Sequence, residues 1–94
     1  MNKYESVVII SPNLEGEAIK ALITKFSDLI NTDGTVSSVD ELGKKKLAYE
    51  IKKNKEGYYI VFKFEANPGL IVELERVYRI TDEVIKFIVI KEEE

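Results

Sequence analysis

The chain has 94 residues, of which 45% are hydrophobic and 33% charged, and its net charge is −3. This length allows one domain with one modest core, and this composition argues against disordered and fibrous proteins. Because the chain has no cysteine and no histidine, it excludes disulfides, thiolate metal sites and histidine-based acid–base catalysis.

The first two predicted elements are a strand and a helix. Residues 4–10 (YESVVII) are rich in β-branched residues and precede turn formers, which is typical of a strand. Asn13 is the expected N-cap of the helix, because an asparagine side chain accepts a hydrogen bond from a free amide. Apolar residues then recur at helical spacing until Ile30, and the sequence NTDG ends the helix.

The middle of the chain is predicted to form a long hairpin. Residues 35–51 exceed the usual length of one strand, so we expect a bend or bulge near Gly43. Residues 52–57 (KKNKEG) are predicted to form a polar loop before a strand over residues 58–65. Side chains alternate along that strand. The set expected in the core is Tyr58, Ile60, Phe62 and Phe64.

A second helix and a last strand complete the pattern. Asn67 is the expected N-cap, and Pro68 suits the first helical position. Residues 84–90 (VIKFIVI) read as a strand. Its predicted core set is Ile85, Phe87 and Val89, because the other set would bury Lys86.

The order β-α-β-β-α-β predicts an α+β, ferredoxin-like fold, with a four-stranded antiparallel sheet and two helices on one face. We expect one domain over residues 1–91 and a short acidic tail over residues 92–94. The other sheet face is left open. Apolar and aromatic residues expected there are Val7, Ile9, Tyr59, Val61, Val84, Ile88 and Ile90. They predict a protein-binding face, and the alternative is an ordinary surface with scattered apolar residues.

Positive charge is concentrated in the middle of the chain. Residues 41–63 hold seven lysines and three glutamates, so this segment carries +4 and the other 71 residues carry −7. Such a segment binds phosphate through local charge even on an acidic protein. Lysines on an edge strand also prevent sheet-to-sheet aggregation, and charge pattern alone leaves both interpretations open.

Two other function classes share this topology. In an RNA-recognition motif the third strand presents aromatic residues to RNA, but here the matching positions, Tyr58 and Ile60, belong to the predicted core set. A small-molecule-sensing or enzymatic domain would need a nucleophile and base or a cluster of metal ligands, and the sequence offers neither. We expect no catalytic residue, cofactor, metal or small-molecule substrate.

Residues 41–52 (ELGKKKLAYEIK) carry the most specific pattern. Together with Tyr4-Glu5, Pro12-Asn13-Leu14 and Arg79-Ile80-Thr81-Asp82, they resemble the bacterial small-subunit ribosomal protein six family over residues 3–91. The chain departs from that family's pattern in two ways. Glu50 stands where many members carry proline, and three lysines replace positions often held by arginine, which binds phosphate through two parallel hydrogen bonds.

The resemblance implies a non-catalytic constituent of the small ribosomal subunit. It would bind the central domain of 16S ribosomal RNA together with small-subunit ribosomal protein eighteen, in the cytoplasm and away from membranes. Residues expected to bind RNA are Lys3, Lys44, Lys45, Lys46, Lys52, Lys53, Lys55 and Arg79. Residues expected to face the partner protein are Val7, Ile9, Tyr59, Val61, Ile88 and Ile90.

Overall fold

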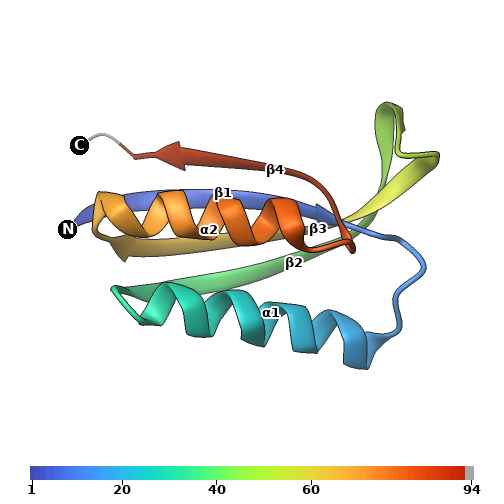
Figure 1. Cartoon of the computed structure of the whole chain (residues 1–94). Coiled ribbons are helices and arrows are strands. Elements are labelled where there is room, and N and C mark those ends of the chain that lie inside the picture. The colour runs from blue at the N-terminus through green and yellow to red at the C-terminus, as the bar shows by residue number, and fades with distance from the viewer. Residues whose placement is uncertain (93–94) are drawn as a thin grey trace.

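The computed structural model describes residues 1–92, so residues 93 and 94 of the predicted acidic tail lie outside it. Its six elements are β1 (Asn2–Ile10), α1 (Gly16–Asn31), β2 (Gly34–Ile51), β3 (Asn54–Ala66), α2 (Pro68–Ile80) and β4 (Val84–Lys91). The strands form one antiparallel sheet in the order β2-β3-β1-β4, and both helices run along the same face of it (Figure 1). The predicted ferredoxin-like α+β fold is confirmed.

The hydrophobic core fills the space between the sheet and the two helices. At its centre, the Phe26 ring of α1 meets Phe62 of β3 and Tyr78 of α2 edge to face, with ring centroids 6.2 and 4.8 Å apart. The Tyr78 hydroxyl and the Ser6 Oγ are 2.9 Å apart, so each of these two buried hydroxyls has a hydrogen-bond partner. Burial also raises the pKa of Tyr78, which keeps the phenol neutral.

The core set predicted for β3 is confirmed. Ile60, Phe62 and Phe64 are almost fully buried, and the half-buried Tyr58 packs against the same core. Burial of every second residue from Tyr58 to Phe64 fixes the register of β3, because a slip of one residue would turn all four side chains to the open face.

The first helix begins later than the sequence predicted. Asn13 lies in a turn, where its backbone N–H donates to the Ser11 Oγ at 3.4 Å, and the helix starts at Gly16 with Glu15 as the N-cap. The prediction of Asn13 as N-cap was therefore wrong. The turn after β1 has to carry the chain from the sheet to the helix layer, and this crossing uses the residues up to Glu15. Asn67 and Pro68 stand at the N-cap and first position of α2, as predicted.

The long hairpin is confirmed, but its loop is shorter than predicted. The register between β2 and β3 shifts between Glu41 and Gly43, and Gly43 has φ +84°, so the expected bulge is present. Lys52 and Lys53 alone form the turn, with φ of 49° and 65°, because positive φ at both central residues matches the twist of a two-residue hairpin.

The last strand contains a second irregularity, which overturns one prediction. Val84, expected on the open face, lies in the core and is only 3% exposed. The reason is a bulge opposite β1, where Ile10 pairs with Val84 but Ile9 pairs with Lys86. Ile85 fills the extra position and is buried as predicted, although outside the main core cluster. Past the bulge, the predicted core residues Phe87 and Val89 pack against the core.

Candidate functional site

The long hairpin continues past the end of the four-stranded sheet. β1 pairs with β3 only as far as Ile10 and Tyr58, so residues 45–57 protrude as a two-stranded hairpin. Figure 1 shows this hairpin rising from the end of the sheet opposite the two chain ends. A two-stranded hairpin is marginally stable by itself, so contacts with the rest of the domain must hold it.

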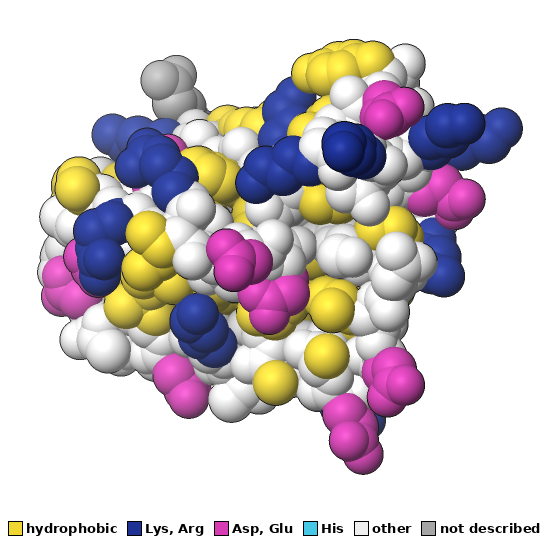
Figure 2. Space-filling model, turned by 45° about the vertical axis from the view of Figure 1, so that its right-hand side comes forward, with side chains coloured by type: hydrophobic (Ala, Val, Ile, Leu, Met, Phe, Trp, Pro, Cys, Tyr) yellow, Lys and Arg dark blue, Asp and Glu magenta, His cyan; other side chains and the backbone are white. Residues whose placement is uncertain are grey.

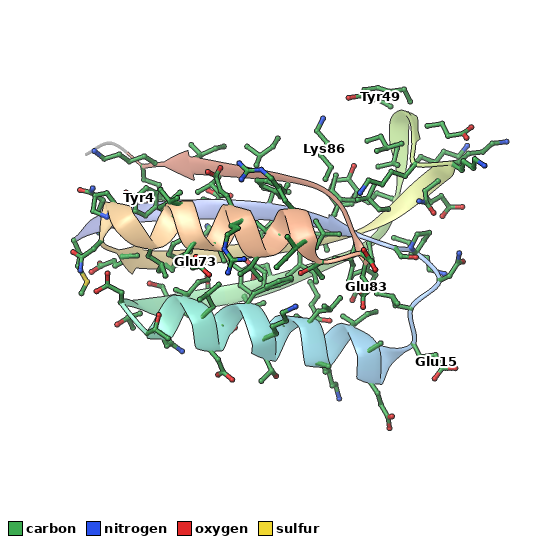
Figure 3. All side chains as sticks on the ribbon, in the orientation of Figure 1. Tyr4, Glu15, Tyr49, Glu73, Glu83 and Lys86 are labelled. Carbon is green, nitrogen blue, oxygen red and sulfur yellow. The ribbon has the colours of Figure 1, made fainter. Side chains whose placement is uncertain are left out.

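Three contacts fasten the hairpin to the domain. A side chain at Gly57 would collide with Ile9, so glycine allows the hairpin to leave the sheet directly over that isoleucine. At the turn, the Lys52 Nζ donates to the Val84 carbonyl oxygen at 3.4 Å. The Lys86 Nζ of β4 donates to the Tyr49 hydroxyl at 3.2 Å, and Figure 3 shows these two side chains pointing toward each other.

The three consecutive lysines of β2 divide between the two faces of the hairpin. Lys44, Lys45 and Lys46 are all exposed, and their partners on β3 are Tyr58, Gly57 and Glu56 in unbroken register. Side chains alternate along such a ladder, so Lys44 and Lys46 share the helix-side face. The Lys45 Nζ lies 5.9 Å from the Tyr59 ring centroid, on the open face.

The other predicted RNA-binding residues are not all brought together. Lys53 and Lys55 are exposed at or beside the hairpin turn, whereas Lys52 and Arg79 line one hollow where the hairpin meets α2 and β4. Lys3 pairs with Glu65 at the opposite end of the sheet, about 23 Å along β3 from Tyr58 at 3.3 Å per residue. Salt screens charges beyond about 8–10 Å, so Lys3 acts separately from the hairpin.

The sequence did not single out Tyr49 and Lys86 as functional residues. Both belong to the site by position, because Lys86 shares the hollow with Lys52 and Arg79, and Tyr49 is 63% exposed beside it. The available signal was alternation along β4, which already placed Lys86 outside the core. That signal does not reveal that the hairpin turn comes back to β4.

The predicted apolar residues do share the open face. Cross-strand pairs join Val7 to both Val61 and Ile88, and Ile9 to Tyr59. Their exposure is uneven. Ile9 and Val61 are each 8% exposed at the centre of the face, whereas Ile88 and Ile90 on the edge strand β4 are 49% and 52% exposed. The residues that a partner would newly bury are therefore mainly on β4.

Charge is distributed unevenly over the surface. Figure 2 shows most Lys and Arg side chains over the upper half of this face, with a few Asp and Glu side chains among them and more near the centre and over the lower part. Within residues 1–92, no group of three or more acidic side chains is arranged to hold a metal ion. No helix in the same range is long and apolar enough to cross a membrane.

Comparison with known proteins agrees with this architecture. The family model described as ribosomal protein S6 matches residues 3–91. The small ribosomal subunit protein bS6 of Clostridium perfringens is 54% identical, with all of both chains covered, and that of Clostridium kluyveri is 50% identical over 99% of each chain. The crystal structure of 30S ribosomal protein S6 from Thermotoga maritima superposes with a TM-score of 0.91 at 35% identity, covering 97% of this chain and 87% of that one. The chain therefore belongs to the ribosomal protein S6 family.

Proposed function

We propose that this chain binds the central domain of 16S ribosomal RNA together with small-subunit ribosomal protein eighteen. Membership of the S6 family makes the chain a structural constituent of the small ribosomal subunit rather than an enzyme. The proposal adds two partners and gives each its own surface. RNA takes the basic hairpin and its base, and the partner protein takes the open sheet face.

The protruding hairpin is the single observation that carries the RNA half of the proposal. It extends Lys46, Lys53 and Lys55 beyond the sheet and leaves Lys44 at its base, where the hairpin departs from the sheet. Backbone phosphates are recognised by such sequence-independent positive charge, and each neutralised phosphate releases counterions. Edge protection alone would need these lysines only along the sheet edge, not on a segment that leaves the sheet.

The exposed isoleucines of β4 support the protein half. Ile88 and Ile90 lie on one face of an edge strand and continue the patch formed by Val7 and Val61. An apolar patch with a polar rim is typical of a protein interface, and Glu5 and Lys63 pair at its margin. The free edge of β4 also leaves backbone groups available to a partner.

The direct test is binding of the purified chain to a central-domain ribosomal RNA fragment, with and without the partner protein, at several salt concentrations. We expect tight, salt-dependent binding when both partners are present. Absence of binding under every condition would refute the proposal. The alternative is an RNA binder of the RNA-recognition-motif type. Such a protein would bind RNA without the partner protein, and Tyr59→Ala would abolish that binding, because Tyr59 is the half-buried aromatic residue on the open face of β3.

A further inference from the structure

Tyr49 is an aromatic residue of the basic hairpin whose ring is largely in water. It is 63% exposed. Within residues 1–92, the rings that pack against one another belong to Tyr4, Phe26, Phe62, Phe64, Tyr78 and Phe87, and Tyr49 joins none of these pairs. A single exposed apolar side chain is ordinary on a protein surface, so its significance depends on how the ring is held and on what surrounds it.

A large bulge in β2 places Tyr49 beside β4. Where β3 has only Lys55, β2 has residues 47–50, and these extra residues leave the regular ladder. Tyr49 thereby reaches Lys86 of β4, whose Nζ donates to the tyrosine hydroxyl at 3.2 Å. Lys86 pairs across the sheet with Ile9, and paired residues share a face. Tyr49 therefore lies at the rim of the open sheet face, where the hairpin leaves the sheet.

The contact with Lys86 holds the Tyr49 ring by its edge (Figure 3). The Lys86 Nζ is 3.2 Å from the hydroxyl oxygen and 5.6 Å from the ring centroid. These two distances differ by nearly the length that separates a tyrosine ring centroid from its hydroxyl oxygen. The ammonium group therefore lies off the hydroxyl end of the ring and not over a ring face. A ring that is fixed in this way loses little side-chain freedom when a ligand stacks on its face.

The surroundings of Tyr49 are positively charged. Lys86 lies at its hydroxyl, and Lys52 and Lys53 form the hairpin turn that follows in the chain. The neighbouring Glu50 lines a separate hollow, in which two lysines balance two glutamates. An aromatic side chain among cations is the combination that proteins use to bind single-stranded nucleic acid, because the cations attract phosphates and the ring stacks on a base.

We infer that Tyr49 is a stacking platform for one unpaired base of the ribosomal RNA. This inference rests on the proposed function and deepens it, because it adds a contact with a base to the expected contacts between lysines and phosphates. Phosphate contacts carry no information about base pairing. Bases inside a duplex cover the faces of one another, so only a base in a loop, a bulge or a strand end can stack on a side chain.

A protein is the less suitable occupant of this position. A protein surface closing over Tyr49 would remove the Lys86 ammonium from water, and the free energy cost of burying that charge needs a carboxylate partner. RNA brings a phosphate next to every base, so the same contact supplies an aromatic face for Tyr49 and a negative charge for Lys86. The aliphatic surface suited to a protein lies further along β4, at Ile88 and Ile90.

The fluorescence of Tyr49→Trp tests the platform directly. The chain contains no tryptophan, so this variant carries a single indole at the proposed site. A base that stacks on the indole quenches its emission. We expect quenching when a central-domain ribosomal RNA fragment and the partner protein are added, after the emission of the unmodified complex is subtracted. Neither the partner protein alone nor a fully paired RNA duplex should quench it.

The matched control for fluorescence is Val72→Trp on α2. Val72 is 72% exposed and lies away from the hairpin and the open face, so its indole should keep its emission when the same RNA binds. Quenching of equal size in both variants would show a general effect of RNA on exposed indoles and would refute the platform.

Affinity measurements separate stacking from ordinary apolar packing. Tyr49→Phe keeps the aromatic ring, whereas Tyr49→Leu keeps an apolar side chain without a ring. Tyr49→Leu should lower RNA affinity by roughly 5- to 150-fold, the range for loss of one stack between a base and an aromatic residue, and Tyr49→Phe should retain most of the affinity. Both variants should keep the slope of log affinity against log salt, because neither removes a phosphate contact. Circular dichroism melting curves verify that each variant is folded.

The outcomes distinguish this inference from the proposed function. If Tyr49→Trp binds RNA with the partner protein but keeps its full emission, the platform is refuted and the proposed function stands. Quenching by the partner protein alone would assign Tyr49 to the protein-binding surface, and equal affinities of Tyr49→Leu and Tyr49→Phe would leave the ring without a role in binding. Either result refutes the platform. If the unmodified chain binds no RNA, the proposed function fails and the platform fails with it.

Discussion

Truncation of Ile88 to alanine should weaken binding of the partner protein by an amount that follows from the residue's exposure. Ile88 is 49% exposed, so about half of its side chain remains to be buried by a partner. Complete burial of an isoleucine contributes about 1.5–3 kcal/mol, and the exposed half is therefore worth about 0.7–1.5 kcal/mol. Ile88→Ala should reduce affinity about 3- to 12-fold, because about 1.4 kcal/mol corresponds to a factor of ten.

Calorimetric titration of the partner protein into the chain, with the RNA fragment present, measures this reduction. The matched control is Val72→Ala on α2, which removes an aliphatic side chain that is 72% exposed but lies away from the open sheet face. The control should bind the partner as the unmodified chain does. Equal reductions in the two variants, or no reduction with Ile88→Ala, would refute the assignment of the open face to the partner protein.

Four further predictions concern the core and the hairpin. Phe62→Ala should lower the free energy of unfolding by about 3–5 kcal/mol in urea titration, because it opens a cavity under both helices. Ser6→Ala should cost about 1–3 kcal/mol, since it leaves the buried Tyr78 hydroxyl unpaired, and adding Tyr78→Phe should recover part of that cost. Burial raises the Tyr78 pKa above its ordinary value of 10.0, so the phenol loses its proton at lower pH in the unfolded chain than in the folded one. The free energy of unfolding should therefore fall as pH rises above 10, and it should fall less in Tyr78→Phe. Lys44→Gln with Lys46→Gln should reduce RNA affinity and flatten its salt dependence, by roughly 0.7–0.9 in slope for each phosphate that is no longer neutralised, without changing the melting temperature.

Specific outcomes would contradict these expectations. A Phe62→Ala variant as stable as the original would mean that the faces of β3 are reversed. Strictly additive costs of Ser6→Ala and Tyr78→Phe would mean that the two hydroxyls do not depend on each other. For the lysines, the control is Lys20→Gln, which removes one positive charge from the exposed side of α1. If that change lowers RNA affinity as much per charge, the hairpin lysines act only through the net charge of the chain.

Hydrophobic periodicity was sufficient to predict the fold because almost every element buries one face. The alternation in β3 and the helical spacing in α1 each have only one orientation that hides the apolar residues. The wrong predictions occur where a backbone irregularity shifts the alternation of side chains by one residue. The bulge between Ile9 and Ile10 adds one residue to β4 and moves Val84 to the core. Such a bulge depends on how two distant strands pair, which local sequence does not encode.

The candidate site was predicted less completely than the fold. Composition identified the lysines of the hairpin, but the approach of Lys52 to β4 depends on the turn, and the turn has two residues instead of the predicted six. Exposure on the open face was also not readable from alternation. Val61 was placed on the correct face, yet its neighbours leave it only 8% exposed, so a charge introduced there would disturb folding as well as binding.

The pairing at the far end of the sheet has a practical consequence for measuring the hairpin. The Glu92 backbone N–H donates to the Lys3 carbonyl oxygen at 2.9 Å, which holds the last described residue beside β1, at the end of the sheet away from the hairpin turn. The chain contains no cysteine, so Glu92→Cys and Lys53→Cys would supply the only two thiols for a pair of fluorescent dyes. The longest dimension of the molecule is 36 Å, a span over which energy transfer between dyes responds steeply to distance. One dye would rest on the ordered sheet while the other reports how the hairpin turn moves when RNA arrives.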